Sequence, residues 1–170
     1  MPLRLILVRH AKSDWGDPAL ADHDRPLNKR GQNAAAALGK WLAAMDMQPA
    51  EVVTSTARRT LETWQIMAPA FDDGIVLRRV PALYHAGPER MLHTLHDCAA
   101  SPLLMLAHNP GIATFATLLL AGIPNHPRFS DYPTGATLVA AFDADDWADV
   151  EFGTGRALAF TTPADLGVKK

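Results

Sequence analysis

The chain lacks several features that would place it in a specialised class of protein. It contains one cysteine, Cys98, which excludes an internal disulfide and favours a reducing compartment such as the cytoplasm. No apolar run approaches the ~20 residues of a membrane span, and the first residues lead straight into a strand pattern instead of a signal peptide. Neither sign of charge is in large excess, because 16 Lys and Arg residues stand against 18 Asp and Glu residues, a net charge of −2. We therefore expect neither a membrane protein nor a non-specific nucleic-acid-binding protein.

What is present is typical of a globular protein. The 170 residues are 48% hydrophobic and 20% charged, and a chain of this length buries roughly two-thirds of its unfolded surface without a disulfide. No internal repeat, low-complexity tract or linker interrupts it. We predict a single domain over residues 1–170.

Short aliphatic runs alternate with helical patterns along the chain. We expect strands at residues 3–8, 51–54, 75–77, 103–107, 138–142 and 157–160. We expect helices at residues 28–45, 57–68 and 110–120, and one that begins at Pro88 with Leu92, Leu95 and Ala99 as its inner stripe. The alternation predicts an α/β fold, a three-layer α/β/α sandwich with a mostly parallel mixed sheet. The last two strands, with little helix between them, predict the mixed edge.

Cationic side chains follow several of the predicted strands. Arg9 and His10 come after the first strand, Arg58 and Arg59 lie just past the second, and His108 follows the fourth. Ligands of open α/β sheets bind beyond the carboxyl ends of the strands. Taken singly, these residues are ordinary surface arginines or a histidine that caps a helix. Their joint placement indicates a dianionic ligand, most simply phosphate.

The same residue types suit a reaction at phosphorus. A neutral imidazole is a nucleophile near pH 7 without a strong base to activate it. Arginine side chains offer paired donors to phosphate oxygens and stabilise the charge on these oxygens during phosphoryl transfer. A second histidine can donate to the same oxygens. This chemistry needs neither a metal nor a cofactor.

Three segments carry a resemblance to a known family. Leu7-Val8-Arg9-His10-Ala11-Lys12 resembles the Arg-His-Gly signature of the histidine phosphatase superfamily, also called phosphoglycerate mutase-like. The segments 55–63 (Ser-Thr-Ala-Arg-Arg-Thr-Leu-Glu-Thr) and 107–111 (Ala-His-Asn-Pro-Gly) resemble the family's second and third motifs. In the second motif an Arg lies four residues before a Thr, and this register selects Arg59 over Arg58. The order and the spacing of the three motifs also match.

Within the superfamily, the chain is similar to the short SixA-type phosphohistidine phosphatases. The segments 24–31, 83–86 and 133–136 are similar to that branch. The resemblance implies a mixed sheet with one antiparallel strand, flanked by helices on both sides. It also implies a histidine phosphatase domain without the cap insertion of larger members, open to a bulky partner.

The resemblance also implies a mechanism. His10 would attack phosphorus in line and become N-phosphorylated, and water would then hydrolyse this intermediate. Arg9, Arg59 and His108 would surround the phosphoryl oxygens. Arg25 would either contact the substrate from its loop or anchor that loop, and we favour anchoring. The expected partner is a phosphorylated protein that carries phosphohistidine, such as a phosphorelay domain, with no nucleic acid or membrane involved.

The general acid of many superfamily members has no clear counterpart in this chain. Asp14, His85 and Glu89 are candidates, although we favour the interpretation of each as an ordinary polar residue at the protein surface. An alkoxide leaves poorly without a proton, whereas an imidazole leaves easily. A site without a dedicated acid therefore favours N-phosphorylated substrates over alkyl phosphoesters.

Three alternatives remain open. The first is a small-molecule phosphomonoesterase of the same superfamily, the second is a phospho-ligand binding module without turnover, and the third is a metal-dependent hydrolase. The spacing of His93, His96 and Cys98 does not support a metal site, because Cys98 lies off the helix face that the two histidines share. Physiological substrate and oligomeric state are not determined by the sequence.

Overall fold

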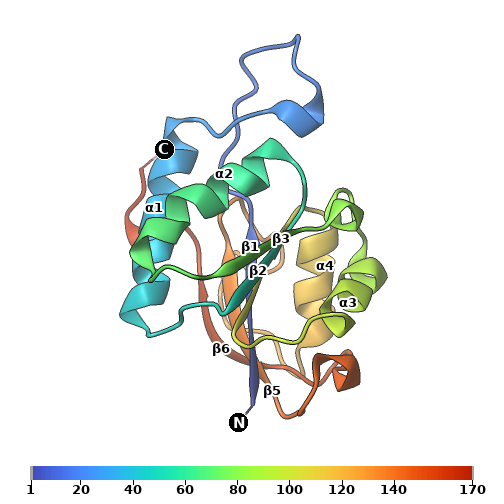
Figure 1. Cartoon of the computed structure of the whole chain (residues 1–170). Coiled ribbons are helices and arrows are strands. Elements are labelled where there is room, and N and C mark those ends of the chain that lie inside the picture. The colour runs from blue at the N-terminus through green and yellow to red at the C-terminus, as the bar shows by residue number, and fades with distance from the viewer. Residues whose placement is uncertain (1, 170) are drawn as a thin grey trace.

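The computed structural model describes residues 2–169 as one six-stranded sheet with helices on both faces (Figure 1). The strands are β1 (Leu3–Arg9), β2 (Glu51–Thr54), β3 (Val76–Arg79), β4 (Leu103–Ala107), β5 (Thr137–Phe142) and β6 (Arg156–Thr161). The helices are α1 (Lys29–Ala44), α2 (Arg58–Met67), α3 (Pro88–His96) and α4 (Gly111–Leu119). No helix within residues 2–169 has both the length and the apolar character that a membrane crossing requires.

The order of the strands in the sheet is β3-β2-β4-β1-β5-β6. Strands β1 to β4 run parallel to one another, and β5 runs antiparallel to both β1 and β6. The prediction of a mixed sheet with one antiparallel strand is confirmed. The carboxyl ends of β1, β2, β4 and β6 therefore lie at one edge of the sheet, together with the segment that enters β5.

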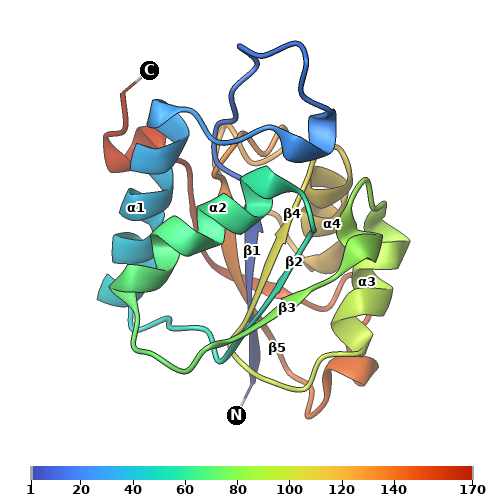
Figure 2. The same ribbon diagram turned by 45° about the horizontal axis from the view of Figure 1, so that its top comes forward.

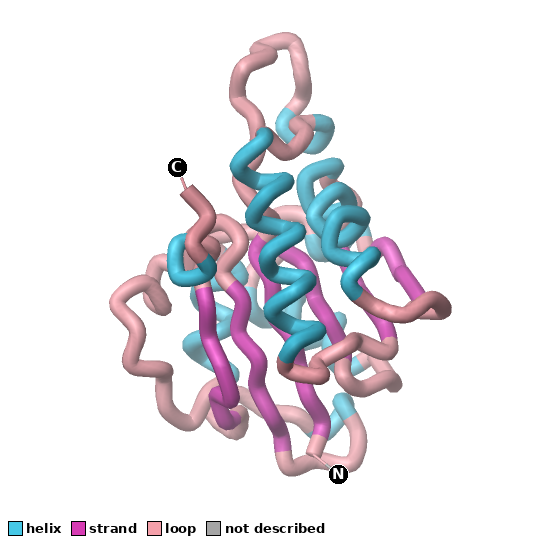
Figure 3. Tube along the Cα trace, turned by 90° about the vertical axis from the view of Figure 1, so that its left-hand side faces the viewer, coloured by secondary structure: helices cyan, strands magenta, loops and turns pink. Residues whose placement is uncertain are grey.

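Alternate residues of each central strand face opposite helical layers, as the period of a strand requires. In β1, Leu5 and Leu7 belong to the hydrophobic cluster under α3 and α4. Ile6 and Val8 belong to the cluster under α1 and α2. Figure 2 shows the two helix pairs on opposite sides of the sheet, and Figure 3 shows α1 lying along one face. Burial on both faces explains why these strands are continuous apolar runs.

The start of α1 follows from its first residues. The Asn28 side chain accepts a hydrogen bond from the Gly31 backbone N–H at 2.8 Å, which caps the helix as its sequence predicts. Gly31 lies against the Lys12 backbone, and a Cβ at position 31 would come within 2.0 Å of the Lys12 carbonyl oxygen. Glycine is therefore required at this position by the close approach of the two segments.

The prediction for the inner face of α3 is wrong by about one residue. Leu92 is half-buried and Ala99 is exposed, while Leu95 is buried as expected. The buried residues of α3 are Met91, Thr94 and Leu95, with Cys98 buried just beyond the end of the helix and Leu92 packed against the same core while partly exposed. This set keeps the helical spacing but is rotated, because docking of the helix against α4 selects its buried face.

Candidate active site

A cavity of about 350 Å³ opens at the edge of the sheet where the parallel strands end. It is lined by Arg9, His10, Lys12, Ser13, Trp15, Asp22, Arg25, Arg59, His85, His108, Asn109 and Thr134. Because β1 and β4 are neighbours, the residues that follow them lie side by side, and the rings of His10 and His108 are 5.3 Å apart between centroids. Arg59 enters from the first turn of α2, which follows β2. The structure thus brings all four principal residues of the sequence prediction into one cavity.

His10 is held in one orientation and one tautomer. Its ring Nδ1 lies 2.8 Å from the Ala11 carbonyl oxygen. Since a carbonyl oxygen only accepts, Nδ1 carries the hydrogen, and Nε2 of the neutral ring keeps its lone pair. The Ala11 N–H in turn donates to the Thr63 hydroxyl of α2, which fixes the segment after β1.

The His10 ring stays neutral at physiological pH. Burial lowers its pKa well below the ordinary value, and although the hydrogen bond to Ala11 opposes this shift, the nearby charges of Arg9 and Arg59 add to it. The side chain is 5% exposed. A neutral imidazole with a free Nε2 is the form that attacks phosphorus.

His108 is also buried and neutral. Burial lowers its pKa to about 3, and the Arg59 charge acts in the same direction. Its Nε2 lies 2.8 Å from the Ser55 hydroxyl oxygen at the end of β2, and this hydroxyl also accepts the Ala57 N–H. When the hydroxyl donates to Nε2, the Nδ1–H of His108 is left free to donate. That Nδ1 atom has no hydrogen-bond partner within residues 2–169.

The two arginines carry further unpaired donors. Arg9 donates from Nη1 to the Tyr132 carbonyl oxygen at 3.1 Å. Arg59 donates from Nη1 to the Asp22 carbonyl oxygen and from Nη2 to the Asp22 carboxylate, at 2.7 and 3.1 Å. The buried Nε atoms of both arginines are without a partner among the described residues. Buried donors are nearly always paired in folded proteins, so these atoms indicate a ligand with acceptor oxygens.

Asp22 is a functional candidate that the sequence analysis missed. Its Oδ1 accepts hydrogen bonds from Arg25, and its Oδ2 accepts from Arg59 and from the Tyr84 hydroxyl at 2.5 Å. Burial pushes the pKa of Asp22 upward, but these hydrogen bonds and the Arg59 charge outweigh burial and hold the pKa well below its ordinary value. Asp22 is therefore ionised and cannot supply a proton near neutral pH. Its position three residues before Arg25 was the available signal in the sequence.

Arg25 lines the cavity, but its guanidinium donates its hydrogen bonds to neighbouring loop residues. Its Nη1 donates to the Ser13 hydroxyl at 2.6 Å and its Nε and Nη2 donate to Asp22. The guanidinium also lies 3.4 Å from the ring centroid of Trp15. These contacts fit the anchoring role that the sequence analysis favoured.

The three candidate acids lie in different places. His85 lines the cavity, with its ring 6.5 Å from that of His108. Asp14 is exposed, and its carboxylate accepts the Gly16 N–H. Glu89 lies in the first turn of α3 and lines a separate depression. Of the three candidates, His85 is therefore the one that the fold brings to the cavity.

Arg58 and the histidines of α3 lie outside the cavity. Arg58 is exposed and pairs with Glu62, one helical turn further along α2. Within residues 2–169 no group of three or more His, Cys, Asp or Glu side chains is arranged to hold a metal ion. His93 instead lies 3.9 Å from the Asp97 carboxylate on the exposed side of α3.

The cavity is strongly cationic although the chain as a whole is slightly acidic. Four cationic side chains and one carboxylate are among its lining residues. Burial, and then the charge of Arg59, lower the pKa of Arg9, which shows how closely the positive groups are crowded. A dianion is the ligand that such a site neutralises.

Comparison with known proteins agrees with this geometry. The model of the histidine phosphatase superfamily (branch 1) matches residues 5–84. A protein of Mycobacterium tuberculosis is 35% identical over 167 residues, which cover 92% of this chain and 99% of that protein. The chain belongs to the histidine phosphatase superfamily. Arg9, His10 and Arg59 lie within the matched residues, and they meet His108 in the cavity.

Two further comparisons agree with this family assignment. A chloroplastic protein of Arabidopsis thaliana is 45% identical over 127 residues, and the match covers 68% of this chain and 58% of that relative, a little over half of its length. A solved structure assigned to phosphohistidine phosphatase SixA of Nakamurella multipartitia superimposes with a TM-score of 0.81 at 26% identity, covering 96% of this chain and 97% of that one. The expected phosphoglycerate mutase-like fold of the SixA type is confirmed.

Proposed function

We propose that the protein hydrolyses phosphohistidine through a covalent phosphoryl intermediate on His10. The observation that supports this most is the set of buried nitrogens without a partner among the described residues: Arg9 Nε, Arg59 Nε and His108 Nδ1. All three belong to residues that line one cavity together with His10. A phosphoryl group supplies acceptor oxygens for such donors, and its phosphorus then lies within reach of the nucleophile.

In the first step, His10 Nε2 forms a bond to phosphorus while the bond from phosphorus to the substrate's imidazole nitrogen breaks. The hydrogen on His10 Nδ1 stays in place, because the Ala11 carbonyl oxygen holds it. The positive charge that develops on the ring is stabilised by that hydrogen bond. The departing imidazole leaves neutral when its second nitrogen already carries a hydrogen.

In the second step, water attacks phosphorus and the bond from His10 Nε2 to phosphorus breaks. The electron pair of this bond returns to Nε2, which restores the neutral ring. Dihydrogen phosphate leaves with both hydrogens of the water, so the hydrogen on His10 Nδ1 again stays in place. Arg9, Arg59 and His108 stabilise the phosphoryl oxygens in both steps.

These two steps need no proton from His85, the candidate acid that lines the cavity, and they therefore suit an N-phosphorylated substrate. Phosphoryl transfer between two imidazoles exchanges one bond from nitrogen to phosphorus for another, and no proton has to be delivered. Asp22 is ionised and cannot deliver one. An alkyl phosphoester would instead require a proton on its leaving oxygen.

The proposal includes the single domain without a cap, independence of metal ions and a cytoplasmic location. The partner would be a protein that presents phosphohistidine at the cavity, such as a phosphorelay domain. Within residues 2–169, no three His, Cys, Asp or Glu side chains are arranged to hold a metal ion. The nucleophile that we propose is a side chain instead of a metal-bound hydroxide. Activity should persist in excess chelator.

The test compares substrates and one variant. Wild-type protein is assayed with phosphohistidine peptides and with a sugar phosphate in excess chelator, and acid-quenched samples are analysed for phosphate on His10. We expect turnover of the peptide, slow turnover of the sugar phosphate, and no turnover by His10→Ala, which should still bind phosphate. Equal or faster hydrolysis of the sugar phosphate would favour a phosphomonoesterase. Phosphate binding without any turnover by wild type would favour a binding module.

A further inference from the structure

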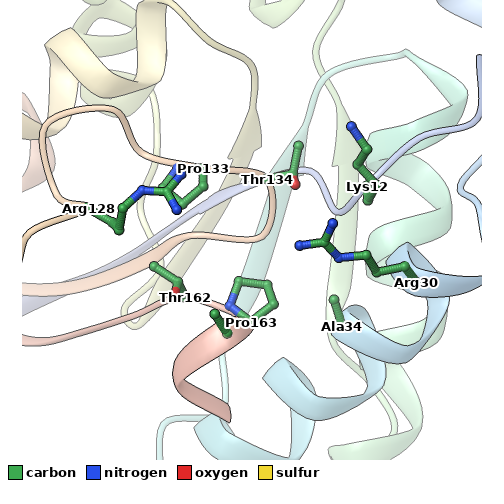
Figure 4. A pocket seen from close by; sticks show the side chains of 9 residues that line it. Lys12, Arg30, Ala34, Arg128, Pro133, Thr134, Thr162 and Pro163 are labelled. Carbon is green, nitrogen blue, oxygen red and sulfur yellow. The ribbon is translucent and has the colours of Figure 1, made fainter. Parts of the chain in front are cut away.

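A second cavity, of about 250 Å³, adjoins the catalytic one and has no role in the steps above (Figure 4). Its walls are Lys12, Arg30, Ala34, Arg128, Pro133, Thr134, Thr162, Pro163 and Ala164. Figure 4 shows the guanidinium groups of Arg30 and Arg128 facing the space from opposite sides, with Lys12 on the same side as Arg30. We call this space the basic cavity.

The positive charge of the basic cavity is only partly compensated. Lys12 and Arg30 form no ion pair within residues 2–169, and both are half-buried. Arg128 is paired with the Asp131 carboxylate at 2.8 Å, and neither Asp131 nor any other acidic residue of the described part lines the cavity. Two cations without a carboxylate partner in a concave site favour the entry of an anion.

The carboxylate of Asp165, the residue after the wall residue Ala164, is already engaged. Asp165 accepts hydrogen bonds from His126 at 2.8 Å and from the Thr162 backbone and hydroxyl at 3.0 Å. These contacts lower the pKa of Asp165 in spite of its partial burial. Asp165 therefore stabilises the turn after β6 and forms no ion pair with Lys12 or Arg30.

Tight packing between separate segments fixes the shape of the basic cavity. Lys12 is placed against the start of α1 because its carbonyl oxygen contacts Gly31 and accepts the Asn28 N–H at 3.1 Å. Gly135 has a φ of +78°, and a Cβ there would come within 2.6 Å of the Pro163 ring. Both contacts exclude a side chain, so the four segments that form the walls are held close together.

The basic cavity and the catalytic cavity share a wall. Lys12 and Thr134 line both of them. Lys12 is two residues beyond His10, a separation of at most ~7 Å along the backbone. A single substrate molecule can therefore occupy both cavities with two anionic groups.

We propose that the basic cavity is a specificity subsite for a carboxylate on the same polypeptide that presents the phosphohistidine. The inference rests on the function proposed above and adds a substrate class to it: phosphohistidine with an acidic side chain nearby in the sequence. The guanidinium of Arg30 is the principal contact, because it faces the cavity and has no carboxylate partner in the described part of the chain. Lys12 and Thr134 connect this contact to the phosphoryl site.

The test is a double-mutant cycle between enzyme and substrate. One set of phosphohistidine peptides carries a single Glu at successive positions from three before to three after the phosphohistidine, which spans about 10 Å on each side in an extended chain. A matched set carries Gln. The enzyme variants are Arg30→Gln, Arg30→Lys and, as a control, Lys29→Gln, which removes one charge from the same turn of α1 at an exposed residue outside both cavities.

At the best position of Glu, we expect Arg30→Gln to raise KM about 10-fold more for the Glu peptide than for its Gln counterpart. Arg30→Lys should recover part of this difference, and Lys29→Gln should affect both peptides equally. Equal effects of Arg30→Gln on both peptides, or no preference of wild type for any Glu peptide, would overturn the subsite while leaving the hydrolysis intact. Failure of wild type to hydrolyse either set would overturn both the function and the subsite.

Discussion

Two adjacent arginines with opposite surroundings offer a sharp test of the site. Arg59 is 4% exposed, and its two Nη atoms donate hydrogen bonds to Asp22. Its Nε is buried and has no hydrogen-bond partner within residues 2–169. Arg58 is exposed and pairs with Glu62 on the surface of α2. Replacement of each by Lys keeps the charge and removes the planar fork.

The structure sets the size of the expected effects. Arg59→Lys removes the Nε donor, and loss of one donor to a developing oxyanion lowers kcat by about 10²–10³-fold. It also removes the two hydrogen bonds to Asp22, whose carboxylate is 39% exposed, which lowers the free energy of unfolding by about 1 kcal/mol after allowance for solvent screening. Arg58→Lys should change kcat less than about 2-fold and stability by a few tenths of a kcal/mol.

The assay is the initial rate of phosphohistidine peptide hydrolysis over a range of substrate concentrations, with urea unfolding of each variant as a measure of stability. Both variants are compared at a temperature where each is fully folded. A loss of activity in Arg58→Lys as large as that in Arg59→Lys would refute the assignment of Arg59. So would an Arg59→Lys variant that keeps a third or more of the wild-type kcat.

Three further outcomes are expected. Asp22→Asn should lower kcat/KM about 10-fold and the free energy of unfolding by about 1–2 kcal/mol. The reason is that the Asp22 carboxylate accepts hydrogen bonds from three side chains. An unchanged urea midpoint would contradict the predicted loss of stability. His108 has a pKa of about 3 in the folded protein, so below about pH 6.5 the unfolded chain binds a proton that the folded chain does not. Wild type should therefore lose about 2 kcal/mol more stability than His108→Gln between pH 7 and pH 5, measured by urea unfolding, and parallel losses would refute that pKa. Gly31→Ala, which drives a Cβ into the Lys12 carbonyl oxygen, should cost about 3 kcal/mol, whereas Gly122→Ala, with no atom within 4 Å of its Cβ, should be close to neutral.

The motifs that carry the candidate site residues were recognisable before the fold was seen, because each of them is local. Arg9 and His10 end an aliphatic run, and His108 ends another, so their meeting follows once both runs are parallel strands that end at one edge of a sheet. Arg59 was distinguished from Arg58 by its spacing from Thr63, and the structure gives a reason for that spacing. The Thr63 hydroxyl accepts the Ala11 N–H directly after His10, one helical turn from Arg59.

The phase of α3 and the role of Asp22 could not be predicted in this way. The periodicity of a helix gives the spacing of its apolar positions, but the neighbouring helix decides which stripe turns inward. Apart from its position three residues before Arg25, Asp22 has the sequence environment of an ordinary loop acid. Its partners Arg59 and Tyr84 lie 37 and 62 residues away, and no local pattern reports such contacts.

The sequence by itself determined the alternation of strands and helices and singled out His10 as the proposed nucleophile, with Arg9, Arg59 and His108 as its neighbours, because hydrophobic period and short motifs act within a few residues. The tertiary structure alone decided which charges share a space. It placed Arg30 across a cavity from Arg128, almost a hundred positions later in the chain, because the carboxyl ends of β1 and β6 and the start of β5 converge on one edge of the sheet.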